Sequence, residues 1–151
     1  MEEKTLIDNP EKALNSIVWY LARRDHSEAE LHKKMRNRYT REAILKAIEI
    51  AKSRKWICPP EELAIKVAQS LHKKNKGYLY ILNYLKNKGL PPVFKEEEVE
   101  LDKAQEILKT KLKLNLNLTF EDKQKAQRLL KNRGFDLETI KAAIHLKNET
   151  N

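Results

Sequence analysis

The stretch "LLKNRGFDLETIKAAI", Leu129 to Ile144, predicts the end of one helix, a turn and the start of another. Gly134 follows a run of bases, and glycine adopts the left-handed backbone that ends many helices without steric cost. Asp136 then supplies the side chain that caps the next helix. The apolar residues of that helix fall on one face: Ile140, Ala143 and Ile144. The stretch therefore favours an all-α fold.

Two similar helix ends lie upstream, "MRNRY" at Met35 to Tyr39 and "LKNKG" at Leu85 to Gly89, and they match "LKNRG" at Leu130 to Gly134. Their spacing of about 50 and then about 45 residues is typical of helical arrays, whose units are too small to bury an apolar face alone. Tyr39 stands where the other two have glycine, so it is either strained in a left-handed backbone or part of a different turn. We therefore predict an elongated array of three tandem three-helix repeats, at residues 9–55, 56–98 and 99–147.

In the first repeat, Asn9 predicts a helix that runs to about Arg24. Its apolar stripe is expected to be Ala13, Leu14, Ile17, Val18, Leu21 and Ala22. Ser27 and Glu30 form a capping box that begins a second helix, with Leu31 and Met35 inward. Thr40 caps a third helix, whose predicted apolar face is Ala43, Ile44, Ala47, Ile48 and Ala51.

In the second repeat, Pro60 can open a helix, and Gly77 precedes another. The inward residues expected of these two helices are Leu63, Ala64, Val67, Ala68 and Leu71, and then Leu79, Leu82 and Leu85. The acid-rich segment 91–102 is either a short helix or a linker, so the third helix of this repeat is short or irregular.

In the third repeat, a long helix is expected from about Val99 to Leu114, with Leu101, Ala104, Ile107 and Leu108 inward. The alternating "LNLNL" at 114–118 can also be read as a strand, but an isolated strand has no ladder to join, so a break is favoured. Thr119 and Asp122 form a capping pair for the next helix.

Basic residues give the chain a formal charge of +9, from 31 Lys and Arg against 22 Asp and Glu. This excess favours acidic partners, nucleic acid among them, although a lysine-rich helical protein is also well solvated, and a solvated helix face is the better explanation of any single lysine. The bases recur once per repeat, and stacking in register would line them along one edge. The candidate partner-binding residues are Arg23, Arg24, Lys33, Lys34, Lys73, Lys74, Lys86, Lys88, Arg128, Lys131 and Arg133. Three tyrosines, Tyr78, Tyr80 and Tyr84, are able to stack on bases but are better explained by packing.

Catalytic motifs are not found in the sequence. The four histidines lack the spacing of a zinc site, and the three glycines lie too far apart for a phosphate loop. We predict no enzyme activity, no metal, no cofactor and no small-molecule substrate. Without a run of about 18 apolar residues, no membrane span is expected either, and the lone Cys58 is expected to be a packed thiol of a cytoplasmic protein.

The segment "YLARRDHSEAEL", Tyr20 to Leu31, resembles the amino-terminal pattern of the RecX family, L-A-x-R-x-x-S-x-x-E-L. The carboxy-terminal "RLLKNRGFDLETIKAAI" is similar to the family's closing pattern of bases, R-G-F and a last helix. Together the two segments bracket nearly the whole chain. The middle departs from the family, with Cys58-Pro59-Pro60 and Pro91-Pro92 where an acidic pair and a complete helix are usual.

The resemblance implies three tandem three-helix units that bind the groove of the RecA recombinase filament and modulate it, usually by inhibiting strand exchange, ATP hydrolysis and co-protease activity. Residues that match position by position divide by role. Ser27, Leu31, Gly134 and Phe135 are expected to serve folding, whereas Arg23, Arg24 and Arg133 are expected to reach a partner. The alternative is a direct binder of single- or double-stranded DNA that uses its helix-turn-helix-like repeats.

Overall fold

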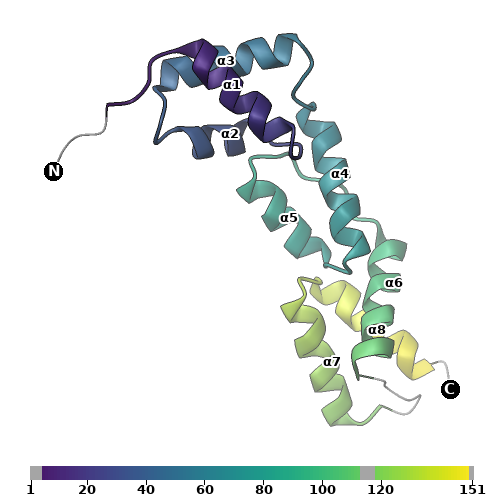
Figure 1. The fold of residues 1–151 in the computed structure, drawn as a ribbon. Coiled ribbons are helices and arrows are strands. Elements are labelled where there is room, and N and C mark those ends of the chain that lie inside the picture. The colour runs from purple at the N-terminus through teal and green to yellow at the C-terminus, as the bar shows by residue number, and fades with distance from the viewer. Residues whose placement is uncertain (1–4, 113–117, 150–151) are drawn as a thin grey trace. The chain divides into compact units, whose positions relative to one another are not determined.

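The computed structural model describes residues 5–112 and 118–149, and this part of the chain is helical, as predicted (Figure 1). The described residues form one isolated β-bridge, between Ile7 and Tyr39, and no helix among them is long and apolar enough to cross a membrane. The chain divides into two compact units. Unit 1 comprises Met1–Ala64 with Asn87–Pro91, and unit 2 comprises Ile65–Lys86 with Pro92–Asn151. The boundaries of the three sequence repeats stay a prediction.

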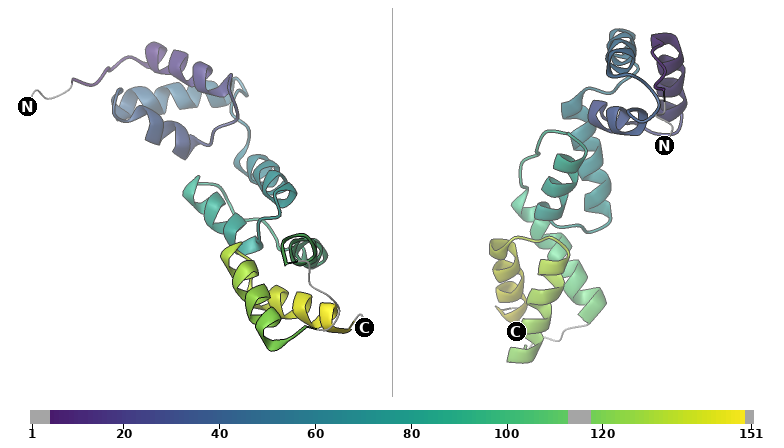
Figure 2. Two further views of the ribbon diagram at one scale, coloured as in Figure 1. Left: turned by 60° about the horizontal axis from the view of Figure 1, so that its bottom comes forward. Right: turned by 90° about the vertical axis from the view of Figure 1, so that its left-hand side faces the viewer.

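Unit 1 contains helices α1 (Pro10–Leu21), α2 (Glu28–Met35) and α3 (Arg41–Ser53) and the first turn of α4 (Pro60–Lys73). All three predicted caps are confirmed. Asn9 Oδ1 accepts from the Glu11 and Lys12 amides, the Ser27–Glu30 capping box is complete, and Thr40 Oγ1 accepts from the Ala43 amide. Helix α1 packs along α3, and α2 lies against both (Figure 2).

The core of unit 1 consists of the apolar faces that the caps orient. Ile17 of α1 and Leu31 and Met35 of α2 are buried, and they meet the predicted face of α3, all five of whose residues are buried: Ala43, Ile44, Ala47, Ile48 and Ala51. Three details differ from prediction. Helix α1 ends at Leu21 rather than near Arg24, because the chain turns there, and the Arg23 and Arg24 amides both donate to the Tyr20 carbonyl. Val18 is exposed, since it lies about 100° around the helix from Ile17. Ala22 is also exposed, because it follows the last residue of α1.

The turn that follows α2 and contains Tyr39 differs from the turns that contain Gly89 and Gly134. The described non-glycine residues with a left-handed φ are Lys55 and Asn75, so Tyr39 is not strained. Its ring is buried, its backbone pairs with Ile7, and its hydroxyl lies 2.6 Å from Ser16 Oγ. Gly89 and Gly134, by contrast, have φ values of +69° and +87°, as the repeated motif predicts.

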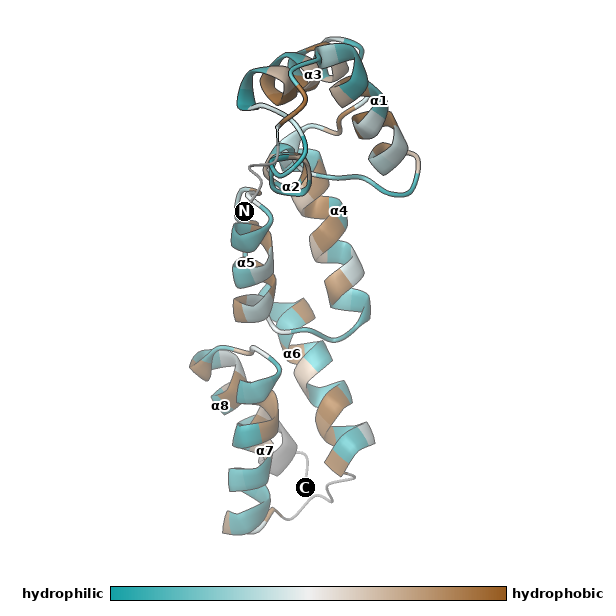
Figure 3. Cartoon of the chain, turned by 60° about the vertical axis from the view of Figure 1, so that its left-hand side comes forward, coloured by the Kyte–Doolittle hydropathy of each residue, from teal (hydrophilic) through white to brown (hydrophobic). Residues whose placement is uncertain are grey.

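Unit 2 contains most of α4 and α5 (Tyr78–Asn87), and then α6 (Glu97–Ile107), α7 (Phe120–Asn132) and α8 (Leu137–Glu149). A π-helical turn, η1 (Leu108–Leu112), extends α6. Helix α8 packs against both α6 and α7. Hydrophobic and hydrophilic residues alternate along α4 and α6 as expected of amphipathic helices (Figure 3). The core residues of this packing are Ala104, Ile107, Leu108, Ala126, Leu130, Phe135, Ile140, Ala143 and Ile144.

Most local predictions in unit 2 are confirmed. Thr119 and Asp122 form a complete capping box, and Asp136 Oδ1 accepts from the Thr139 amide across 2.8 Å. The prediction that Leu79 points inward is wrong, because it is 49% exposed and Ile81 is buried instead. The "LNLNL" segment lies outside the described residues, apart from its last residue.

The acid-rich segment 91–102 is part linker and part helix, the two structures considered for it. Residues 91–96 form no helix, whereas Glu97 begins α6. Glu100 of this segment is fully buried and pairs with Lys103, which is also buried. Its Oε1 accepts from the Tyr78 amide at 2.7 Å, and Lys103 Nζ lies 2.7 Å from His72 Nδ1 and donates to the Lys76 carbonyl. The acid-rich segment thus supplies the carboxylate of a buried charge pair that ties α6 to the loop before α5.

Candidate partner-binding surface

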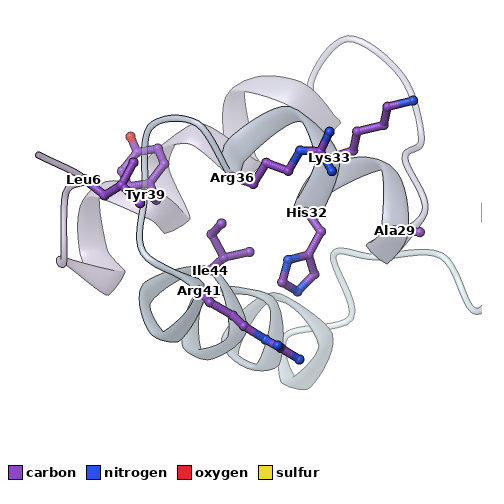
Figure 4. A pocket seen from close by; sticks show the side chains of 8 residues that line it. All are labelled: Leu6, Ala29, His32, Lys33, Arg36, Tyr39, Arg41 and Ile44. Atoms are coloured by element: carbon purple, nitrogen blue, oxygen red, sulfur yellow. The ribbon is translucent and has the colours of Figure 1, made fainter. Parts of the chain in front are cut away.

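A cationic hollow lies between α2 and α3 in unit 1, and we call it the α2–α3 pocket (Figure 4). Its volume is about 590 Å³. His32 and Lys33 project from α2, and Arg36 projects from the residue that caps its end, so spacings of four and three residues place Arg36 beside both. Arg41 enters from the first position of α3. Four basic side chains from two helices therefore border one hollow.

The floor of the α2–α3 pocket is apolar. Ile44 lies at its centre in Figure 4, with Leu6 and Tyr39 at one end and Ala29 at the other. Leu6 is 39% exposed, whereas Tyr39 is 4% exposed and Ile44 is 1% exposed. The residues before α1 complete this floor, since the Ile7 amide donates to the Arg38 carbonyl and the Thr40 amide donates to the Ile7 carbonyl.

The charge of the α2–α3 pocket is not neutralised within the described part of the chain. None of the described residues that line it is Asp or Glu, and no ion pair of the described residues involves Lys33, Arg36 or Arg41. Guanidinium groups bind carboxylates and phosphates in a bidentate manner, and they remain charged at any physiological pH. The pocket is therefore suited to an anionic partner.

Two predicted binding residues of unit 1, Arg24 and Lys88, serve the fold. Arg24 Nη2 and Lys88 Nζ lie 2.7 Å and 3.2 Å from Oε2 of Glu30, whose side chain is 9% exposed. Burial raises the pKa of the Glu30 carboxyl, but hydrogen bonds from Arg24, the Ser27 amide and Lys88 outweigh it and lower the pKa to about 2. These two bases thus hold a buried carboxylate at the start of α2.

Two further predicted residues of unit 1, Arg23 and Lys34, contact aromatic rings. The Arg23 guanidinium lies 3.3 Å from the centroid of Trp19, which is 53% exposed. Lys34 Nζ lies 3.0 Å from Nε2 of the buried His26 and over the ring of Tyr20. Burial lowers the pKa of His26, so its ring is neutral near pH 7. Because Nδ1 faces the Arg24 carbonyl and must donate to it, Nε2 accepts from Lys34.

The predicted residues of unit 2 lie mostly in solvent. The five exposed ones are Lys73, Lys74, Lys86, Arg128 and Lys131. Arg133 is half-buried, and its carbonyl accepts from the Gly77 amide at 2.9 Å. The tyrosines divide: Tyr78 donates to the Val93 carbonyl, while Tyr80 and Tyr84 stack with ring centroids 6.3 Å apart. That these bases join those of unit 1 along one edge stays a prediction.

Sequence reasoning identified Lys33 but not the other members of the α2–α3 pocket. Spacing on α2 was a signal for His32 and Arg36, since both lie within one turn of Lys33. Leu6 and Arg41 gave no signal, because only the packing of α2 against α3 brings them together. The described residues contain no group of three or more His, Cys, Asp or Glu able to hold a metal ion. Cys58 is half-buried, with Sγ 3.7 Å from Glu62 Oε2.

Comparison with known proteins matches both ends of the chain to one family. Residues 13–49 match the model of the first three-helix domain of RecX, and residues 98–144 match that of the third. The regulatory protein RecX of Prosthecochloris aestuarii (strain DSM 271 / SK 413) is 32% identical over 139 residues, which cover 88% of this chain and 91% of that protein.

Solved structures show the same fold. The crystal structure of RecX from Lactobacillus salivarius superposes with a TM-score of 0.77 at 17% identity, covering 92% of this chain and 96% of that one. A crystal structure of regulatory protein RecX superposes with a TM-score of 0.72 at 19% identity, covering 90% of this chain and 73% of that one. The two matched domains and the 32% identity to a RecX protein over most of both chains lead to one conclusion: this chain belongs to the RecX family of regulatory proteins.

Proposed function

We propose that this chain is a non-enzymatic regulator that binds the helical groove of the RecA recombinase filament and inhibits its recombination, ATPase and co-protease activities. Family membership over most of the chain carries the proposal, because the chain resembles regulatory proteins along its length. The α2–α3 pocket supports it by offering a cationic surface with no internal counter-charge among the described residues.

The mechanism follows from differential affinity. A regulator that binds one arrangement of filament subunits more tightly than another shifts the filament toward that arrangement, and equal affinity for both would shift nothing. Such binding needs an extended complementary surface rather than a catalytic cavity. Each unit carries exposed bases for such binding, Lys33 in unit 1 and Arg128 in unit 2 among them.

The test is a titration of recombinase ATPase on single-stranded DNA with this protein, at two ionic strengths. A fall in turnover at substoichiometric protein supports inhibition by capping of filament growth. Unchanged turnover over a stoichiometric range contradicts the proposal.

Charge-reversed variants locate the contact. Lys33→Glu should weaken inhibition while leaving helicity and Tm unchanged, because Lys33 is exposed and forms no ion pair among the described residues. Lys33→Glu together with Lys34→Glu should weaken inhibition further, but Lys34 also contacts His26 and Tyr20, so the single variant is the cleaner probe. The control is Lys46→Glu, an exposed residue on α3 that does not line the α2–α3 pocket.

Direct DNA binding is the second candidate, and Trp19 favours it. Trp19 and Tyr20 border a second hollow of about 590 Å³ in unit 1, which Lys12 and Arg38 also line. An exposed aromatic ring beside Lys and Arg side chains is typical of proteins that bind single strands by stacking on the nucleobases. Binding through six to ten phosphates should weaken by about 10³ to 10⁵ between 50 and 200 mM salt, whereas a protein interface should weaken less. Trp19→Ala should reduce DNA affinity under this alternative and leave it unchanged under the first.

A further inference from the structure

We infer that the α2–α3 pocket binds an acidic peptide segment that carries one large apolar side chain. This inference rests on the proposed function, because it names the chemistry of the partner segment that the regulator would recognise. Three observations carry it: the cationic rim, the apolar floor and the absence of an exposed Phe, Tyr or Trp ring among the described lining residues.

The rim requires anionic groups from the partner. Arg36 and Arg41 approach the hollow from different helices, so two carboxylates on one short segment can each meet a guanidinium. His32 and Lys33 add further donors to the lining. Because the described lining holds no carboxylate, an acidic segment replaces no internal ion pair when it binds. Electrostatic attraction also accelerates the encounter.

The floor requires an apolar group. Leu6 remains 39% exposed at one end of the floor, and covering it removes apolar surface from water. A central buried anchor inside a ring of charged contacts is how protein interfaces concentrate their affinity. A polyanion without apolar groups would pair with the basic side chains of the rim but leave Leu6 exposed to water.

Nucleic acid fits this pocket less well than a peptide. Single-strand binders stack bases on exposed aromatic rings. Tyr39 is the one Phe, Tyr or Trp in the described lining, and it is 4% exposed, with its hydroxyl held 2.6 Å from Ser16 Oγ. The Tyr39 ring is therefore inaccessible to a nucleobase. A peptide side chain such as Phe or Leu, flanked by Asp and Glu, fits the pocket better.

The experiment measures fluorescence anisotropy of a labelled twelve-residue peptide of Asp and Glu with one central Phe, titrated with the full chain at low salt. Arg36→Glu and Arg41→Glu should each weaken binding about tenfold or more. Lys46→Glu makes the same charge change on the opposite side of α3 and should change binding less than about threefold. Circular dichroism confirms that each variant is folded.

A double-mutant cycle tests the apolar floor. Replacing the peptide Phe by Ser should weaken binding to the parent protein about tenfold, and the same replacement should have little effect on the Leu6→Ser variant. Because Leu6 is exposed and precedes α1, this variant is expected to fold.

Several outcomes overturn the inference. The Phe peptide fails to bind, or Lys46→Glu and Arg41→Glu weaken its binding equally. The Phe and Ser peptides bind with equal affinity. A mixed-sequence single-stranded oligonucleotide binds more tightly than the peptide, and its binding depends on the same arginines. The recombinase is absent from this assay. Loss of peptide binding with retained ATPase inhibition therefore rejects the inference alone, and peptide binding without ATPase inhibition rejects the proposed function alone.

Discussion

The Gly77 amide donates a hydrogen bond to the carbonyl of Arg133 across 2.9 Å, and thereby joins the turn before α5 to the turn after α7. The two backbones are in direct contact. A Cβ on Gly77 would lie 2.3 Å from the carbonyl carbon of Gly134, closer than real atoms approach. The Leu79 amide adds a second hydrogen bond, 2.8 Å from the Gly134 carbonyl. Glycine at position 77 is therefore needed for the packing of unit 2 rather than for a left-handed turn.

Gly77→Ala should destabilise unit 2 by about 1–3 kcal/mol or more, because backbone atoms have to move apart to admit the methyl group. The measurement is the thermal midpoint by circular dichroism. Asn75→Gly is the control two residues away, and it should be neutral or slightly stabilising, since Asn75 has a left-handed φ of 57° that glycine adopts freely. A parent-like midpoint for Gly77→Ala would show that the two turns are not packed this closely.

Ser27→Ala should cost about 1–2 kcal/mol. Ser27 Oγ accepts from the Glu30 amide as a helix cap and also donates to the Lys88 carbonyl, and the residue is 4% exposed. Thr119→Ala is the matched control, because Thr119 caps α7 in the same way but is exposed. It should cost about 0.5–1 kcal/mol. Denaturant midpoints of the two variants give the comparison, and equal losses would mean that the Lys88 carbonyl contributes nothing.

Stability should fall as the pH is lowered through the titration of Glu30. Its carboxyl pKa is lowered from 4.5 to about 2 in the folded state, so the folded state favours the charged form. This contribution is complete above about pH 4.5 and is lost as the pH falls from there toward 2. Urea midpoints measured from pH 6 to pH 2.5 should show this loss in the parent.

The Glu30→Gln variant should show a flatter profile over the same interval, because the titrating group is gone. Glu49→Gln, an exposed site on α3, should retain the slope of the parent. If Glu30→Gln and the parent have parallel profiles, the network of Arg24, Glu30 and Lys88 does not control the acid sensitivity.

Lys103→Met should destabilise unit 2 by about 3–5 kcal/mol, because it leaves the fully buried Glu100 without its counter-charge. Adding Glu100→Gln should recover much of this loss. The amide keeps an oxygen that can accept from the Tyr78 amide, and it removes the buried charge. Chemical denaturation of the single and double variants measures the recovery, and additive losses would contradict a coupled pair.

Local features of the fold were predictable because they depend on residues within one turn of each other. The caps at Asn9, Ser27, Thr40 and Thr119 all involve partners two or three positions away, and each is present. The apolar faces of α3 and α8 follow helical periodicity in the same way. Leu79 was assigned wrongly, since periodicity gives the spacing of an apolar face and not which of two adjacent faces packs.

The candidate site was less predictable. Arg24 and Lys88 look like any exposed base in the sequence, yet both contact Glu30, and Lys88 does so from 58 positions away. Arg41 and Leu6 likewise give no sign of a shared pocket. Charge composition predicts that bases are abundant, but it does not separate those that hold the fold from those left for a partner.

The sequence by itself determined the helices, their caps and the two glycine turns, because backbone hydrogen bonding and helical periodicity act over three or four residues. It also carried the RecX resemblance, in the two patterns near its ends. Only the tertiary structure decided which charges are buried, which bases are paired and where a cationic hollow forms. Those properties depend on desolvation and on contacts between residues distant in the chain, such as Glu30 with Lys88 and Glu100 with the Tyr78 amide.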